Sequence, residues 1–283
     1  MLTLLDRRDA FRKVLDAERA AGRTVGLVPT MGYLHAGHLS LMRRAVAECD
    51  VTAATIFVNP LQFGPSEDLA AYPRDPDGDR AKAEDTGVTV LFAPTQSEMF
   101  PEPPVTTVSV TSLSHDLEGA SRPTHFVGVA TIVAKLFALA GPCRAYFGEK
   151  DYQQLAVIRR LAVDLSLSVD VIGCPTVRDR DGLALSSRTA YLTKQERALA
   201  PTLYQALARG RAAIEEDHQT DPAAVGATMR EVIANQPEFS LDYAEVRDAD
   251  DLTPPSTITG EVRLLIAARL GRARLIDNLG AHV

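Results

Sequence analysis

Residues 25–46 read VGLVPTMGYLHAGHLSLMRRAV, and this stretch decides the fold. Residues 25–28 form a nearly continuous apolar run, which is typical of a strand buried on both faces of a parallel sheet. Leu39, Met42 and Val46 then fall on one face of a helix. The stretch therefore predicts a strand, a glycine-containing turn and a helix, which is the repeating unit of an α/β fold.

The same alternation continues along the first two thirds of the chain. Helical spacing of apolar residues predicts helices over residues 126–140 and 155–165. Further buried strands are predicted at residues 51–58, 88–92, 144–147 and 169–172. Strands that alternate with helices predict a parallel sheet covered on both faces.

The rest of the chain follows another order. Helices are predicted over residues 193–213 and 222–234, and they are followed by short strands at residues 240–246, 262–267 and 273–276. This order predicts a small α+β domain. We place the boundary between domains of residues 1–178 and 179–283.

Composition limits the classes of function. The 283 residues are 46% hydrophobic and carry 30 Lys and Arg against 37 Asp and Glu, a net charge of −7. Such a balance argues against a broad nucleic-acid surface, although it leaves room for a local phosphate pocket. No apolar run approaches the ~18 residues of a membrane span, and residues 1–30 lack the apolar core of a secretory signal. Three scattered cysteines, none in a CxxC pair, argue against disulfides and structural zinc and favour a reducing cytoplasm.

The turn PTMGYLHAGH, residues 29–38, is the sharpest chemical signal. Gly32 permits a tight turn and Gly37 lets a ligand approach the backbone. His35 and His38 lie three residues apart where the helix begins, so both imidazoles can face one point, and a helix start already favours phosphate. The alternative is one capping histidine and one solvated histidine. Zinc is disfavoured because the motif is not HExxH, and the absence of GxxxxGK[ST] and GxGxxG disfavours P-loop kinases and nicotinamide dehydrogenases.

Two later clusters also suit phosphate. In FGEKDYQQ, residues 147–154, Lys150 and Gln154 are four apart, which predicts one shared helical face at the end of a strand. In VRDRDGLALSSR, residues 177–188, two hydroxyls precede Arg188, which can bind phosphate through two hydrogen bonds. The alternatives are a solvated lysine in a turn and a Ser-Ser-Arg helix cap.

Two further groups of polar residues lie near the predicted sheet edge. Gln62, in NPLQFG at residues 59–64, could bind a substrate hydroxyl or carboxylate, or could merely stabilise a turn. Asp75, Asp77 and Asp79 could hold magnesium, although such a run is usually a solvated helix start.

Taken in order, these segments resemble the pantoate–β-alanine ligase (pantothenate synthetase) family over essentially the whole chain. HxGH alone is shared with nucleotidyltransferases and aminoacyl-tRNA synthetases, whereas the ordered combination is specific. The segments are PTMGYLHAGH at 29–38, NPLQFGPSEDLAAYPRD at 59–75, HFVGVATIV at 125–133, FGEKDYQQL at 147–155, VRDRDGLALSSR at 177–188, ERALAPTLYQAL at 196–207, DYAEVRDADDL at 242–252 and RLIDNLG at 274–280.

The resemblance implies a Rossmann-like nucleotide domain, a smaller C-terminal capping domain and a homodimer. It implies that ATP, with Mg²⁺, activates (R)-pantoate as pantoyl adenylate, and that β-alanine then displaces AMP to give pantothenate for coenzyme A. Nucleic acid and membranes are not expected as partners.

The resemblance also implies a set of site residues. The catalytic groups are His38 as proton donor to the departing phosphate, His35, Lys150 and Arg188. The substrate-binding residues are Gln62 and Gln154, which bind pantoate, with Asn59 nearby; Gln62 also faces the pocket of the amine substrate. Asp79 is assigned to magnesium. The ATP-binding residues are Met31, Gly32, Tyr33, Leu34, His35, Ala36, Gly37, His38, Gly148, Glu149, Lys150, Asp151, Val177, Leu185, Ser186, Ser187 and Arg188.

Some positions depart from the family pattern, but none removes a charged catalytic group. Gly78 stands where an acidic residue is frequent, which weakens a metal assignment there. The other departures are Thr124, Val127, Leu185 and Thr189.

Two rival hypotheses remain at this point: an adenylyltransferase with a phosphorylated acceptor, and a nucleotide sensor or tRNA-binding relative without turnover. Residues 64–75, rich in Gly, Pro and Asp, are a candidate lid.

Overall fold

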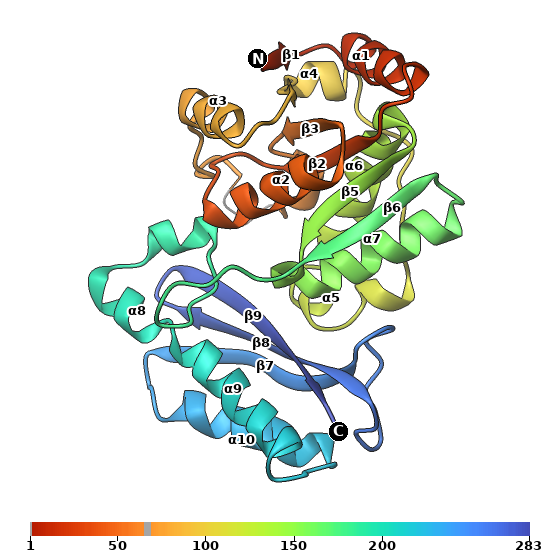
Figure 1. Ribbon diagram of the computed structural model, residues 1–283. Helices are drawn as coiled ribbons and strands as arrows, with labels where there is room; N and C mark the ends of the chain where they lie inside the picture. Colours follow the sequence, from red (N-terminus) through yellow and green to blue (C-terminus); the bar gives the residue numbers. More distant parts are fainter. Residues whose placement is uncertain (1, 65–68) are drawn as a thin grey trace. The chain divides into compact units, whose positions relative to one another are not determined.

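One parallel sheet organises the first part of the molecule, with strand order β1-β4-β3-β2-β5-β6 (Figure 1). The computed structural model describes residues 2–64 and 69–283, so residues 65–68 of the predicted lid lie outside the described residues. The strands are β1 Thr3–Leu5, β2 Val25–Thr30, β3 Val51–Ile56, β4 Val90–Phe92, β5 Cys143–Gly148 and β6 Val169–Cys174. Every pairing in this sheet is parallel, which confirms the predicted α/β class.

Alternate residues of the strands enter two separate cores on the two faces of the sheet. Leu27 of β2 packs in one core with residues of α1, α6 and α7, and its neighbour Val28 packs in the other with residues of α2 and α3. In β5, Ala145 and Tyr146 divide in the same way. The period of two in a strand therefore fixes which helix covers which face. The helical segments are α1 Arg8–Ala20, α2 Ala36–Glu48, η1 Pro60–Gln62, α3 Pro76–Asp85, α4 Gln96–Met99, η2 Ser112–Ser114, α5 Glu118–Ser121, α6 His125–Ala140, η3 Glu149–Asp151 and α7 Tyr152–Asp164.

Two compact units make up the chain. The first comprises Met1–Glu149 and Gln153–Pro175, and the second comprises Lys150–Tyr152 and Thr176–Val283. In the second unit, β7 Phe239–Asp248, β8 Glu261–Leu270 and β9 Ala273–His282 form an antiparallel sheet in that order. Its helical segments are η4 Ser187–Tyr191, α8 Lys194–Leu199, α9 Thr202–Glu215 and α10 Pro222–Ala234.

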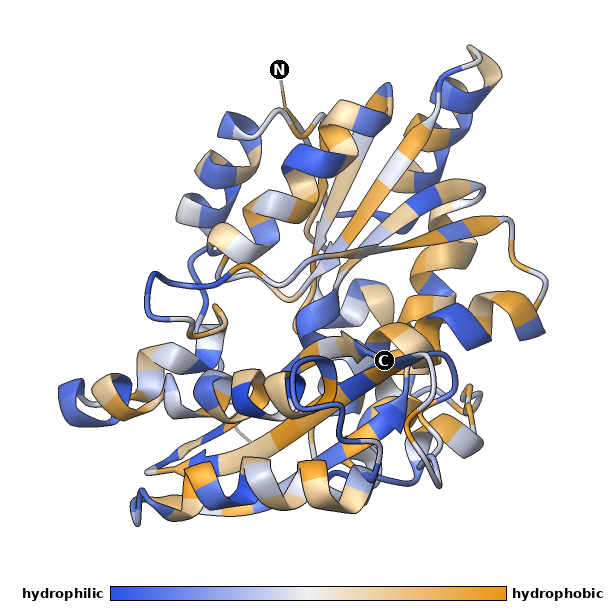
Figure 2. Cartoon of the chain, turned by 60° about the horizontal axis from the view of Figure 1, so that its bottom comes forward, coloured by the Kyte–Doolittle hydropathy of each residue, from blue (hydrophilic) through white to orange (hydrophobic). Residues whose placement is uncertain are grey.

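The core of the second unit is built from one face of each helix and from the sheet. Leu207 of α9, Met229 of α10 and Leu264 of β8 are completely buried in it. In Figure 2 the helices carry hydrophilic and hydrophobic residues side by side, as expected for elements that cover a core on one face only.

Several elements differ from the sequence-based prediction. The single helix predicted over residues 193–213 is wrong: α8 ends at Leu199 and α9 begins at Thr202, because Pro201 has no N–H to continue the helix. The strands of the small sheet are longer than predicted, since β8 pairs with β9 along its whole length. β1 and α1 were not predicted. Among the described residues, no helix is both long and apolar enough to cross a membrane.

Candidate active site

The order of the strands marks where a ligand should bind to the parallel sheet. From β2 the chain proceeds to β3 and β4 on one side and then returns to β5, which pairs with β2 on its other side (Figure 1). Open α/β sheets bind ligands at such a switch point, outside the carboxyl ends of the strands. The HxGH turn follows β2, Gly148 ends β5 and Glu149 begins η3, so two predicted segments arise at this point.

The two histidines of the turn form a reciprocal helix cap. His35 is the N-cap of α2, and its Nδ1 accepts the N–H of Gly37 at 3.2 Å. The N–H of His35 in turn donates to Nδ1 of His38 at 3.4 Å. Because each Nδ1 is an acceptor, the neutral imidazoles carry their proton on Nε2. The rings lie 4.1 Å apart between centroids and are tilted by 38°, so the two imidazoles lie side by side at the start of one helix.

Glycine is required at two positions of this turn. A Cβ at Gly37 would lie 2.9 Å from Cε1 of the His35 ring that caps the helix. Gly32 has φ of 83°, and a Cβ there would lie 2.9 Å from a carboxylate oxygen of Asp79. The sequence predicted a tight turn at Gly32 but not that a buried side chain approaches it.

Asp79 is only 1% exposed, and its carboxylate accepts two backbone N–H groups of the turn. Tyr33 donates to Oδ2 at 2.7 Å and Leu34 donates to Oδ1 at 2.6 Å. In the described part of the chain, no three His, Cys, Asp or Glu side chains gather as metal ligands would. Both oxygens of Asp79 already accept a backbone N–H group, which does not fit a ligand of a resident magnesium ion. The assignment of Asp79 to magnesium therefore stays a prediction that these hydrogen bonds do not support.

Asn59 and Gln62 lie together after β3 and are 1% and 8% exposed. The amide of Asn59 donates to Oε1 of Gln62 at 3.1 Å, and the amide of Gln62 donates to the sulfur of Met31 at 3.0 Å. The structure thus brings two predicted substrate-binding residues next to a residue of the HxGH turn. Their segment packs closely on α6, where a Cβ at Gly128 would lie 2.1 Å from the carbonyl oxygen of Leu61.

Lys150 and Gln154 do not share one α-helix, contrary to the prediction. Lys150 lies in the 3-10 turn η3, whereas Gln154 lies half-buried in α7, because the chain leaves β5 through a tighter turn before α7 begins. The Lys150 ammonium lies 3.3 Å from the Asp151 carboxylate.

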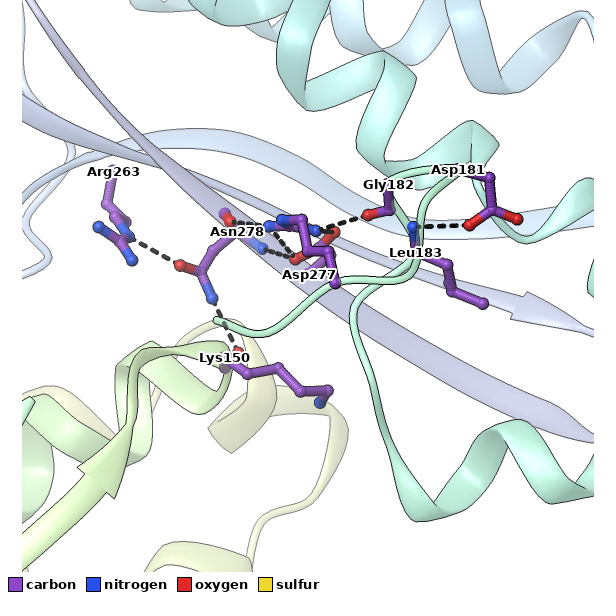
Figure 3. Close-up of polar contacts among 8 residues, drawn as sticks. Lys150, Asp181, Gly182, Leu183, Arg263, Asp277 and Asn278 are labelled. Carbon is purple, nitrogen blue, oxygen red and sulfur yellow. Dashed lines mark hydrogen bonds and ion pairs between the residues drawn. The ribbon is translucent and has the colours of Figure 1, made fainter. Parts of the chain in front are cut away.

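The backbone of Lys150 is anchored on strand β9 of the second unit (Figure 3). The amide of Asn278 donates to the carbonyl of Lys150 at 2.8 Å, and its oxygen accepts from Nε of Arg263 at 2.7 Å. Asn278 is 3% exposed, so both hydrogen bonds are buried contacts within the second unit.

An ion pair with Asp277 of strand β9 holds the loop that leads to the Ser-Ser-Arg segment. Arg178 donates to both oxygens of Asp277, at 2.6 and 2.9 Å, and to the carbonyl of Gly182 at 3.0 Å. Downstream, Ser186 Oγ accepts the N–H of Arg188 at 3.2 Å and so caps η4. The cap proposed as an alternative for this segment is therefore present.

The predicted site residues divide between the two units. Those in the first unit are Met31, Gly32, Tyr33, Leu34, His35, Ala36, Gly37, His38, Asn59, Gln62, Asp79, Gly148, Glu149 and Gln154. Those in the second are Lys150, Asp151, Val177, Leu185, Ser186, Ser187 and Arg188.

Sequence reasoning missed the residues that hold these segments. His125 contacts the carbonyl of Gln62 through Nδ1 at 3.0 Å, and Asp277 and Asn278 hold Arg178 and Lys150 within the second unit. A histidine at a helix start and an adjacent Asp-Asn pair were visible, but nothing local identified the distant backbone groups that they bind.

Comparison with known proteins gives one consistent result. A family model described as pantoate-beta-alanine ligase matches residues 3–280. The pantothenate synthetase of Heliobacterium modesticaldum is 52% identical over 262 residues, which cover 93% of each chain. The crystal structure of pantothenate synthetase from Thermus thermophilus is 47% identical, has a TM-score of 0.94 and covers 100% of both chains.

A third relative was solved with ligands. The pantoate-beta-alanine ligase from Francisella tularensis, complexed with beta-gamma ATP and beta-alanine, is 31% identical with a TM-score of 0.82 and covers 99% of this chain and 97% of its own. The family match along nearly the whole length, the identity and the shared fold agree, and the chain belongs to the pantoate-beta-alanine ligase family.

Proposed function

We propose that this protein condenses (R)-pantoate with β-alanine to pantothenate at the expense of ATP, which is cleaved to AMP and pyrophosphate. The observation that carries the proposal is the pair of reciprocally capped histidines at the switch point, with Nε2–H donors at a helix N-terminus. Such a site favours a phosphate chain and can follow its charge as a bond breaks.

The first step activates the acid. A carboxylate oxygen of pantoate attacks the α-phosphorus of ATP, which arrives with Mg²⁺ as part of the substrate, and the bond from that phosphorus to pyrophosphate breaks. His38 donates a proton or hydrogen bond to the departing phosphate from Nε2, with His35 beside it. Lys150, Arg188, Ser186 and Ser187 neutralise and hold the phosphates.

The second step forms the amide. The amine of β-alanine attacks the carbonyl carbon of pantoyl adenylate, AMP leaves with the electron pair of the broken C–O bond, and the amine loses a proton to solvent. Gln62, Gln154 and Asn59 hold pantoate, so the protein contributes mainly position and charge neutralisation.

The proposal extends to the whole protein. We propose a homodimer, a nucleotide domain of residues 1–178 with a smaller domain of residues 179–283, and action in the cytoplasm as part of coenzyme A synthesis. None of the three cysteines in the described residues forms a disulfide, which is compatible with a reducing compartment.

The test is release of AMP and pyrophosphate from Mg-ATP with D-pantoate, with and without β-alanine. We expect sustained AMP release only with both substrates, matched by the amide product, and pantoate-dependent exchange of labelled pyrophosphate into ATP without β-alanine. If neither substrate stimulates ATP cleavage, the ligase proposal fails. Retention of AMP in a dinucleotide made from a phosphorylated acceptor would instead establish the adenylyltransferase alternative.

A further inference from the structure

We propose that Asp79 is a positioning residue that holds the turn before α2 in the conformation that presents His35 and His38. The proposal rests on the function proposed above and assigns Asp79 a task other than binding metal. It follows from the contacts of α3 with the turn, all within the first unit.

The turn has a conformation that needs external support. Gly32 and Tyr33 are consecutive residues with positive φ, 83° and 53°. Tyr33 has a Cβ, so its left-handed backbone costs on the order of 1 kcal/mol. Two successive N–H groups in such a turn form a concave site for an anion.

In this protein the anion is a side chain of the chain itself. Each oxygen of the Asp79 carboxylate accepts one of the two successive N–H groups, those of Tyr33 and Leu34, at 2.7 and 2.6 Å. Gly32 admits this approach, since a Cβ there would lie 2.9 Å from Oδ2. Both hydrogen bonds are charge-assisted and buried, which makes them stronger than neutral ones.

A second residue of α3, Lys82, binds the turn at the carbonyl of Leu34, whose N–H is bound by Asp79. The ammonium of Lys82 donates to the carbonyl of Leu34 at 3.0 Å. Both backbone groups of Leu34 are thus bound to one helix, and the next residue, His35, is the N-cap of α2. A shift of this segment would displace the His35 ring and, through the His35 N–H, the ring of His38.

The test is a double-mutant cycle between Asp79 and His38, in which the activity of each variant is measured by pyrophosphate exchange. Asp79→Asn keeps the size of the side chain but offers one oxygen acceptor, so one of the two N–H groups loses its partner. We expect a roughly 10- to 100-fold fall in kcat, with the KM for pantoate and the half-saturating Mg²⁺ concentration within about twofold of wild type. In a His38→Ala background, Asp79→Asn should lower kcat less than threefold, because it acts through the histidine.

The controls separate positioning from folding and from metal binding. Asp85→Asn, at the exposed end of the same helix, should leave kcat unchanged. If circular dichroism shows that Asp79→Asn fails to fold, Lys82→Met takes its place in the cycle, with an expected fall in kcat of about threefold to tenfold. Lys82→Met removes the contact with the Leu34 carbonyl and a 3.8 Å ion pair with Asp75.

Three outcomes would overturn the proposal: equal costs of Asp79→Asn with and without His38, unchanged kcat, or a rise of more than tenfold in the Mg²⁺ requirement. An inactive wild-type protein would instead refute the proposed function.

Discussion

The Nε2 of His38 is the group on which the chemistry proposed for the turn depends, because its Nδ1 is committed to the backbone of His35. We predict that His38→Ala lowers the rate of adenylate formation by roughly 10²–10³, the cost of one lost transition-state donor. Single-turnover formation of pantoyl adenylate measures it. His115→Ala, at an exposed histidine, is the matched control and should retain wild-type rates. Near-full turnover by the His38 variant would remove the proton-donor role.

The adjacent glutamines of α7 differ in what they already bind. Gln153 is 4% exposed, and its side chain bonds the N–H of Glu118 and the carbonyls of Leu113 and Asp116, so its role is to hold that loop. Gln154 is half-buried and is the residue that we assign to pantoate.

We therefore predict that Gln154→Ala raises the KM for pantoate about tenfold or more and the KM for ATP less than twofold, because one hydrogen bond to the acid is lost. Initial-rate kinetics with each substrate varied in turn will show it. Gln205→Ala, at an exposed glutamine of α9, is the control. Equal changes in both KM values would contradict a pantoate contact.

Strand β9 does more than complete a sheet, because it presents two consecutive polar side chains that are almost fully buried. Asp277 binds Arg178 and Asn278 binds the carbonyl of Lys150, so one strand holds two segments proposed to bind phosphate. The predicted strand ended at residue 276, one residue before this pair.

We predict that Asn278→Ala raises the KM for ATP by about three- to tenfold and lowers the free energy of unfolding by about 1–3 kcal/mol, because the Lys150 carbonyl and the Arg263 guanidinium lose a buried partner. Urea denaturation and ATP kinetics measure the two effects. Asn235→Ala, at the exposed C-cap of α10, should change the KM for ATP less than twofold. An unchanged KM for ATP in Asn278→Ala would separate β9 from the function of Lys150.

At the scale of the whole molecule, the homodimer is a proposal with a direct test. We predict that light scattering after size exclusion gives twice the 30.6 kDa of one chain at micromolar concentration. The mass should not change on addition of ATP and pantoate if the dimer is constitutive. A mass of one chain at all concentrations would contradict the proposal.

What the sequence determined by itself is what local pattern encodes. Apolar runs placed five of the six parallel strands, and glycine and histidine spacing placed the HxGH turn at the end of β2. The ordered motifs identified the family, which the comparisons confirm. Strand β1 was not predicted because its three residues are too few to show a period. The break at Pro201 was not predicted because it lies within a continuous helical pattern.

Only the tertiary structure decided which groups each polar side chain binds. The run of aspartates at residues 75–79 suggested metal, yet Asp79 binds two backbone N–H groups 45 and 46 residues away along the chain. Likewise Asn278 binds a carbonyl 128 residues away. Such bonds depend on how strands and helices pack and not on sequence spacing. Every residue except proline carries the same backbone N–H and C=O groups, so the sequence does not show which of them a side chain will bind. The sequence thus determined which reactive groups this protein carries, and packing decided which side chains hold those groups in place.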